Sequence, residues 1–139
     1  MILLDTNVVS EAIRVDAAPG VLEWINRQAA QTLYISSFTV AEMAFGIGTL
    51  PKGKRREEMA SFLEAALRLF ESRILPFDDR SARRYAELAV KARKAGRGFP
   101  IPDGYIAAIA SAHGFAVATR DDSAFAAAGL RVIDPWKTA

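Results

Sequence analysis

The sequence predicts an α/β fold in which helices cover both faces of a five-stranded parallel sheet. Short apolar segments, each suited to a buried strand, alternate along the 139 residues with longer segments whose apolar residues recur at helical spacing. This alternation is typical of a parallel sheet covered by helices on both faces. No linker, repeat or low-complexity stretch interrupts it, so we expect residues 1–139 to form one domain.

The expected elements follow one another at short intervals. The strands are Ile2–Leu4, Leu33–Ile35, Ile74–Pro76, Phe115–Thr119 and Arg131–Ile133. The helical patterns include Val21–Ile25, Val40–Leu50, Met59–Phe70, Tyr85–Ala89 and Asp103–Ala112.

The composition excludes several kinds of site. The chain has no cysteine, which rules out disulfides and thiolate-bound metals and fits a reducing, cytoplasmic compartment. Its single histidine, His113, rules out zinc sites and nucleases that need a histidine pair. The first apolar run ends at Asp5, too early for a signal peptide or a membrane span. A net charge of +2 and a pI of about 9.1 favour anionic partners only slightly.

Four acids fall where a parallel sheet binds ligands, beyond the carboxyl ends of its strands. Asp5 follows the first strand and Asp121 the fourth, while Asp103 opens the last long helix and Glu42 lies near the start of the helix after the second strand. Converging carboxylates repel one another unless cations neutralise them. Oxygen donors with almost no histidine select Mg²⁺ or Mn²⁺, which can activate water for phosphodiester cleavage. The pattern favours a metal-dependent nuclease.

Each acid also has a purely structural interpretation. The segment 39–42, Thr-Val-Ala-Glu, matches a helix capping box, and Asp103 suits a helix cap or a first-turn acid. Asp121 is placed to begin a short helix that ends at Gly129. Asp5 is hardest to explain in this way, because a charge that closes a buried strand is rarely without a role. Together, the four acids make coincidence much less plausible than any one does.

Several motifs, in this order, resemble PIN-domain proteins, in particular the VapC/FitB group of toxins. They are Met1-Ile-Leu-Leu-Asp5-Thr6-Asn7, Thr39-Val-Ala-Glu42, Pro102-Asp103-Gly-Tyr-Ile-Ala-Ala and Ala118-Thr-Arg-Asp121, with the terminal Ile133-Asp-Pro-Trp136. The resemblance implies a three-layer α/β/α fold and a Mg²⁺- or Mn²⁺-dependent endoribonuclease that is the toxin of a type II toxin–antitoxin pair.

The resemblance also assigns residues. It implies that the catalytic and metal-binding acids are Asp5, Glu42, Asp103 and Asp121. Asn7 and Thr119 match the small polar residues beside such a site. Asp122 is the alternative fourth acid, since many relatives carry an acid at the place of Ala124.

The same resemblance implies partners. It predicts an antitoxin whose C-terminal part covers the site and whose N-terminal part binds operator DNA, an RNA substrate, and a homodimer of the toxin, with no membrane. Three basic stretches, 52–56, 80–84 and 91–97, suit either RNA or simple solvation. Among the basic residues we expect Lys52, Lys54, Arg55 and Arg120 to contact RNA.

Three other functions fit less well. A haloacid-dehalogenase-like phosphatase needs a second acid two residues after the first, where this chain has Asn7. The segment 48–54 nearly matches a phosphate-binding P-loop, but Arg55 replaces the required Ser or Thr, so we expect a helix–helix loop. A catalytically silent RNA- or protein-binding module predicts RNA binding without metal-dependent cleavage. We expect structural roles for His113, Trp24 and Trp136.

Overall fold

The computed structural model describes residues 1–121 and 123–137, and it contains the expected five-stranded parallel sheet. The strand order is β3-β2-β1-β4-β5, and every neighbouring pair is parallel. The strands are β1 (Ile2–Leu4), β2 (Leu33–Ser36), β3 (Ile74–Leu75), β4 (Ala116–Ala118) and β5 (Val132–Ile133). The order reverses direction between β1 and β4, and ligands of open α/β sheets gather at the carboxyl edge of such a switch point.

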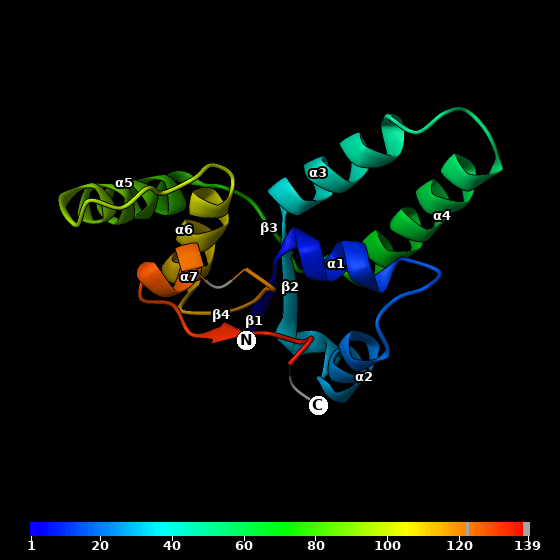
Figure 1. The fold of residues 1–139 in the computed structure, drawn as a ribbon, viewed down its shortest axis with the longest axis horizontal. Helices are drawn as coiled ribbons and strands as arrows, with labels where there is room; N and C mark the ends of the chain where they lie inside the picture. Colours follow the sequence, from blue (N-terminus) through cyan, green and yellow to red (C-terminus); the bar gives the residue numbers. More distant parts are fainter. Residues whose placement is uncertain (122, 138–139) are drawn as a thin grey trace.

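Helices cover both faces of this sheet, as the sequence predicted (Figure 1). On one side lie α1 (Thr6–Ala12), α2 (Pro19–Arg27), α3 (Ser37–Gly48) and α4 (Lys54–Leu69). On the other side lie α5 (Asp79–Lys94), α6 (Asp103–His113) and α7 (Ser123–Ala127). The short helix α1 was not predicted. The segment between α3 and α4 is a helix–helix loop and follows no strand, which confirms that it is not a P-loop.

Neighbouring residues of each strand contribute to opposite cores. Leu4 and Ala118 join the core under α1–α4, whereas Leu3 and Val117 join the core under α6 and α7. Side chains alternate along a strand, so a sheet covered on both faces needs strands that are apolar throughout. Two of the expected structural residues fit this layout, because Trp24 is buried in the first core and His113 ends α6 beside Phe115. No described helix is long and apolar enough to cross a membrane.

Gly104, the second residue of α6, lets aromatic rings lie directly on the helix. A Cβ atom there would come within 3.0 Å of Cε2 of Tyr85 and 3.2 Å of Cδ1 of Phe99. Tyr85 also stacks on Phe99, with ring centroids 5.7 Å apart, and contacts Tyr105 at 4.8 Å. These rings hold the start of α6, and with it Asp103, against α5.

We expect Gly104→Ala to lower the free energy of unfolding by about 1 kcal/mol, because the strain of overpacking exceeds the gain in helix propensity. Gly46→Ala in α3 is the matched control, since among the described residues nothing beyond its own helix backbone and chain neighbours lies within 4 Å of a Cβ built there. That variant should gain up to about 1 kcal/mol. Urea unfolding of the two variants measures both effects, and equal stabilisation of the two would show that the rings do not restrict Gly104.

Candidate active site

Asp5 is a buried carboxylate at the junction of β1 and α1. Its side chain accepts two hydrogen bonds, from the backbone N–H of Thr6 to Oδ1 at 2.8 Å and from the hydroxyl of Thr119 to Oδ2 at 2.8 Å. Burial raises the pKa of Asp5 to about 6 against the lowering effect of these bonds, and the charges of Asp103 and Glu42 raise it further. No ion pair is recorded for Asp5 within the described residues. The ionised form is therefore left without a positive partner.

Thr119 connects the end of β4 to the start of α1. Its fully buried hydroxyl donates to Asp5 and accepts from Nδ2 of Asn7 at 3.1 Å and from the backbone N–H of Asp121 at 3.1 Å. Oδ1 of Asn7 in turn accepts from the backbone N–H of Arg120 at 3.4 Å. Asn7 and Thr119 thus lie beside Asp5, and their functional role stays a prediction.

A chain of hydroxyl groups leads to Glu42. Thr6 donates to Oε1 of Glu42 at 3.0 Å and lies 3.0 Å from the hydroxyl of Thr39, which is 3.4 Å from that of Ser36. Each hydroxyl carries a single proton, so the bonds run in one direction, from Ser36 through Thr39 and Thr6 to the carboxylate. The sequence analysis did not predict this series of hydroxyl hydrogen bonds. The only sign in the sequence that Thr6 could belong to the site was its position next to Asp5.

The capping-box interpretation of Thr39 and Glu42 is wrong. Ser36 is the N-cap of α3, and its side chain accepts the backbone N–H of Thr39 at 3.2 Å. The helix therefore begins at Ser37 instead of Val40, and Glu42 lies in its second turn. The exposed Glu42 is held by Thr6 of α1, which is a tertiary contact and not a helix cap.

Asp103 and Asp121 complete the acidic edge. Asp103 is the first residue of α6, and the preceding Pro102 makes no side-chain cap, so Asp103 is a first-turn acid. Partial burial raises the pKa of Asp103, and the charges of Asp121 and Glu42 raise it further. Asp121 is exposed just beyond β4. The alternative fourth acid, Asp122, lies outside the described residues.

The four acids share one edge of the sheet without forming a closed ligand cage. Asp5 is affected by Asp103 and Glu42, and Asp103 by Asp121 and Glu42, so all four lie within electrostatic range. In residues 1–121 and 123–137, no three His, Cys, Asp or Glu side chains are grouped closely enough to hold a metal ion. Mutual repulsion gives a physical reason for this spacing. The donor set is entirely oxygen, which suits a hard divalent cation.

The expected RNA-contacting residues lie in two separate places. Lys52, Lys54 and Arg55 lie on the α3–α4 connection and the start of α4, at the end of α3 that points away from the sheet (Figure 1). Lys54 forms an ion pair with Glu58 at 3.8 Å. Arg120 instead follows Thr119 directly, and its guanidinium carbon lies 4.5 Å from the ring centroid of Trp136. RNA contact by either group remains a prediction.

Comparison with known proteins identifies the family of this chain. Residues 2–130 match the PIN domain family. The chain belongs to this family. The VapC ribonuclease Y4jK of Sinorhizobium fredii is 49% identical over 140 residues, with 100% of both chains covered. Toxin FitB of Neisseria gonorrhoeae is 42% identical over 137 residues, which cover 98% of this chain and 99% of FitB.

Solved structures give the same result for the fold. The crystal structure of FitAcB from Neisseria gonorrhoeae matches with a TM-score of 0.94 and 42% identity, over 99% of both chains. FitAB has also been solved bound to a DNA fragment. The resemblance of the sequence to the VapC/FitB group of PIN-domain proteins is therefore confirmed, and so is the α/β/α fold that it implied.

We expect Asp5→Asn to stabilise the metal-free protein at neutral pH. Because the folded-state pKa of about 6 lies above the ordinary 3.8, the folded protein keeps this proton longer than the unfolded chain does. The resulting stability is complete below about pH 4 and is lost as the pH rises through about 6, a loss of roughly 3 kcal/mol. The amide has no charge to bury and avoids this loss.

Thermal melting in EDTA at pH 4.5 and 7.5 measures the effect. The variant should gain in melting temperature over the wild type mainly at pH 7.5. Asp16→Asn is the control, because Asp16 is exposed and its hydrogen bonds with Arg14 lower its pKa. A gain for Asp5→Asn that is the same at both pH values would contradict the assigned ionisation.

Proposed function

We propose that this PIN-domain chain is the toxin of a toxin–antitoxin pair and acts as a Mg²⁺- or Mn²⁺-dependent endoribonuclease. The observation that carries the proposal is Asp5, a carboxylate only 5% exposed, with a pKa of about 6 and no recorded ion pair within the described residues. A divalent cation beside it would compensate the cost of the ionised form. The ribonuclease name of the relative Y4jK supports RNA as the substrate.

The residues of the site have different proposed roles. We expect Asp5 and Asp103 to hold the cation directly. Asp5 is buried and Asp103 is partly buried. Glu42 and Asp121 add charge from exposed positions, while Thr119 and Thr6 fix two of these carboxylates by hydrogen bonds. When bound, Mg²⁺ or Mn²⁺ supplies the polarisation of the phosphodiester and of the attacking water. Cation binding must displace a proton from Asp5 below about pH 6, so affinity should fall as the solution is acidified.

We expect Asp103→Asn to abolish RNA cleavage while the chain stays folded, because the amide is nearly isosteric but lacks the charge. Cleavage of a structured RNA is measured with Mn²⁺ and with EDTA, and circular dichroism checks the fold. Millimolar Mn²⁺ should also raise the melting temperature of the wild type more than that of the variant. Asp79→Asn is the matched control, since Asp79 is likewise the first residue of a helix but pairs with Arg83 at 3.0 Å.

Two outcomes would contradict the proposal. Normal turnover by Asp103→Asn would remove that acid from the site. Wild-type protein that binds RNA but does not cleave it in Mn²⁺ would support the silent binding module instead.

We further infer an antitoxin protein as the partner, because FitB is a relative and FitAcB and FitAB, as solved, match this fold along almost the whole chain. The antitoxin would bind operator DNA, and this chain would reach DNA only through it. A homodimer of the toxin is part of the same proposal. We expect the inhibitory segment to bring an Arg, which can bond carboxylates with two parallel N–H groups, to Asp5 and Asp103.

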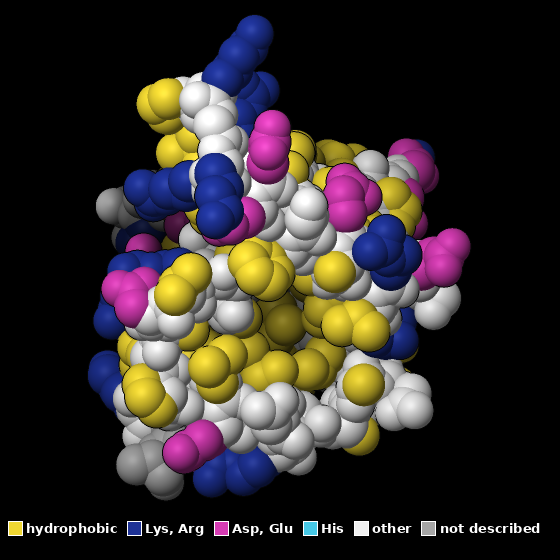
Figure 2. Space-filling view, turned by 90° about the vertical axis from the view of Figure 1, so that its right-hand side faces the viewer, with side chains coloured by type: hydrophobic (Ala, Val, Ile, Leu, Met, Phe, Trp, Pro, Cys, Tyr) yellow, Lys and Arg dark blue, Asp and Glu magenta, His cyan; other side chains and the backbone are white. Residues whose placement is uncertain are grey.

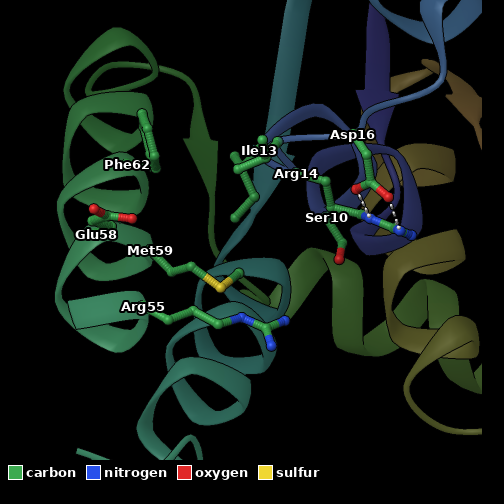
Figure 3. A pocket seen from close by; sticks show the side chains of 9 residues that line it. Ser10, Ile13, Arg14, Asp16, Arg55, Glu58, Met59 and Phe62 are labelled. Atoms are coloured by element: carbon green, nitrogen blue, oxygen red, sulfur yellow. Dashed lines mark hydrogen bonds and ion pairs between the residues drawn. The ribbon is translucent and has the colours of Figure 1, made fainter. Parts of the chain in front are cut away.

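A groove between α1 and α4 offers the antitoxin a docking surface. Figure 2 shows a hollow lined largely by hydrophobic side chains on the side of the molecule where these helices lie. Side chains from both helices point into the groove in Figure 3. The lining residues are Ser10, Ile13, Arg14, Val15, Asp16, Arg55, Glu58, Met59 and Phe62. Apolar contacts inside charged borders suit an amphipathic segment.

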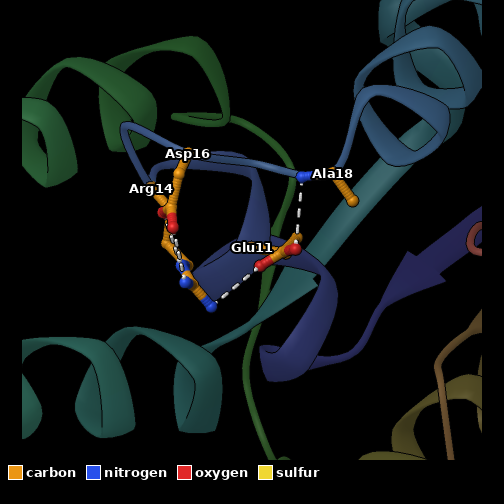
Figure 4. A network of polar contacts seen from close by, with 4 residues as sticks. All are labelled: Glu11, Arg14, Asp16 and Ala18. Carbon is orange, nitrogen blue, oxygen red and sulfur yellow. Dashed lines mark hydrogen bonds and ion pairs between the residues drawn. The ribbon is translucent and has the colours of Figure 1, made fainter.

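One wall of this groove is fixed by a small polar network (Figure 4). Arg14 donates two hydrogen bonds to Asp16, both at 3.1 Å, and forms an ion pair with Glu11 at 3.4 Å. Glu11 also accepts the backbone N–H of Ala18 at 3.2 Å. These contacts hold the turn between α1 and α2 in place, so the groove exists before a partner arrives.

We expect Phe62→Glu to weaken antitoxin binding at least tenfold while leaving RNA cleavage unchanged. Phe62 is 54% exposed, so the substitution costs little folding stability, but it places a charge in the apolar part of the groove. Leu69→Glu is the control, because Leu69 is an exposed residue of the same helix that does not line the groove. Calorimetry with the cognate antitoxin measures the affinity, and equal losses for the two variants would place the docking surface elsewhere.

A further inference from the structure

We propose that Arg120 and Trp136 form a phosphate clamp that holds the RNA backbone beside the carboxylates. The clamp rests on the proposed function, in that RNA is its ligand. The guanidinium carbon of Arg120 lies 4.5 Å from the centroid of the Trp136 ring. A guanidinium that stacks on a ring keeps its N–H groups at its edge, where they can bond two oxygens of one phosphate.

The backbone of Arg120 is anchored to the acidic edge. Its N–H donates to Oδ1 of Asn7 at 3.4 Å, Asn7 donates to Thr119 at 3.1 Å, and Thr119 donates to Asp5 at 2.8 Å. The start of this exposed side chain is therefore fixed relative to the most buried carboxylate. Within the part of the chain that the structure describes, no such link joins Lys54 to the acids, and Lys54 pairs with Glu58 instead.

The side chain of Arg120 nevertheless stays apart from the acids. No ion pair is recorded for it within the described ranges 1–121 and 123–137, although its neighbour in sequence is Asp121. An arginine folded onto the carboxylates would compete with a metal ion for the same oxygens. The ring of Trp136 gives the guanidinium another favourable position, so the charge remains available to a phosphate.

The identity of residue 136 supports this role. Nε1 of Trp136 is buried without a hydrogen-bond partner among the described residues, a cost that phenylalanine would not carry. Trp is also the aromatic side chain that attracts a guanidinium most strongly. The ring packs against the core under α1–α4 on the side away from solvent, so it offers little surface for stacking a base. The indole therefore serves the guanidinium.

The sheet holds Trp136 in register with Arg120. The backbone N–H of Thr119 donates to the carbonyl of Ile133 at 2.9 Å, which aligns the segments that follow β4 and β5. The backbone N–H of Trp136 then donates to Oδ1 of Asp134 at 2.9 Å. Guanidinium and ring thus meet because two neighbouring strands end side by side.

A positively charged side chain is needed here because the site itself is strongly negative. Four carboxylates at one edge repel an approaching phosphate, and one divalent cation neutralises only half of their formal charge. A positive group anchored to this edge can attract the phosphate without occupying the metal-binding oxygens. Arg120 is anchored there through its backbone N–H, while its guanidinium lies over Trp136 instead of on the carboxylates.

RNA binding in EDTA tests the clamp without cleavage. Fluorescence anisotropy of a single-stranded RNA, measured over a range of salt concentrations, gives the affinity and its salt dependence. Arg120→Ala should weaken binding several-fold and reduce the slope of log affinity against log salt by about 0.7, the value for one phosphate contact. Arg131→Ala is the matched control, because it removes the same charge from an exposed site at the amino end of β5 and should leave the slope unchanged.

Variants of Trp136 and Arg120 distinguish the positioning of the guanidinium by the ring from the effect of its positive charge alone. Trp136→Leu removes the ring and keeps Arg120, so it should raise KM for RNA several-fold with little change in kcat, and Trp136→Phe should raise KM less. Arg120→Lys keeps the charge but not the flat stacking group, and it should fall between Arg120→Ala and the wild type. Melting temperatures show whether each variant is folded.

Tryptophan fluorescence gives a readout that does not depend on RNA or activity. In a Trp24→Phe background Trp136 is the only tryptophan, and titration with inorganic phosphate should change its emission. Arg120→Ala should abolish that change.

An unchanged salt slope in Arg120→Ala, in a protein whose wild type cleaves RNA, would overturn the clamp and leave the proposed function standing. A wild type that cleaves no RNA would remove the proposed function, and the phosphate titration of Trp136 would still decide whether the clamp binds an anion. An emission that does not respond to phosphate would overturn the clamp.

Discussion

The burial of one carboxylate, Asp5, constrains the architecture around it. Its neighbours Leu3 and Leu4 each enter a different core, so the strand cannot turn the acid toward water by shifting its register. The carboxylate must then find its hydrogen-bond donors at the edge itself, from the first N–H of α1 and from Thr119, which follows β4. Because β4 pairs with β1, Thr119 lies within reach of Asp5, and the acid lies at the switch in strand order.

Neutral hydroxyl groups, not cationic side chains, orient two of the four acids, Asp5 and Glu42. Thr119 positions Asp5 and Thr6 positions Glu42, and each donates one proton without contributing charge. A lysine or arginine in either place would fix the carboxylate equally well but would neutralise it permanently. The edge therefore keeps its negative charge, which is the property that a cation-dependent enzyme needs and that a purely structural cluster would avoid.

The sequence predicted the features that depend on local pattern. Strands buried on both faces are mostly apolar, so the strands of the sheet, and the acid that follows β1, could be located from short apolar runs in the sequence. Helix α1 was missed because its seven residues, which follow the N-cap Asp5, show too little periodicity. The start of α3 was misplaced because Ser36 and Thr39 are both good caps, and only the structure shows which one is used.

Contacts between distant segments could not be predicted in this way. The bond from Thr6 to Glu42 joins α1 to α3, and the stacking of Arg120 on Trp136 depends on how β4 and β5 end. Neither contact leaves a periodic pattern in the sequence. The family resemblance assigned the four acids, and the structure places them along one edge of the sheet. The resemblance did not show which side chains hold them or that Arg120 is anchored there through its backbone N–H.

Three kinds of positive charge are proposed to compete for one acidic edge: a metal ion, an antitoxin arginine and Arg120 of the chain itself. Stacking on Trp136 removes Arg120 from this competition.

The geometry also allows the antitoxin arginine to reach the acids. The groove lies at the end of α1, and Asp5 lies at its start, seven residues or about 10 Å along the helix axis. An extended segment covers about 3.3 Å per residue, so three or four residues beyond the groove reach the acids. A short partner segment can therefore be held by apolar contacts at one end of α1 and still place its cation at the other. Affinity and inhibition then reside in different residues of the partner, which allows the site to be blocked tightly although the acids themselves are only partly enclosed.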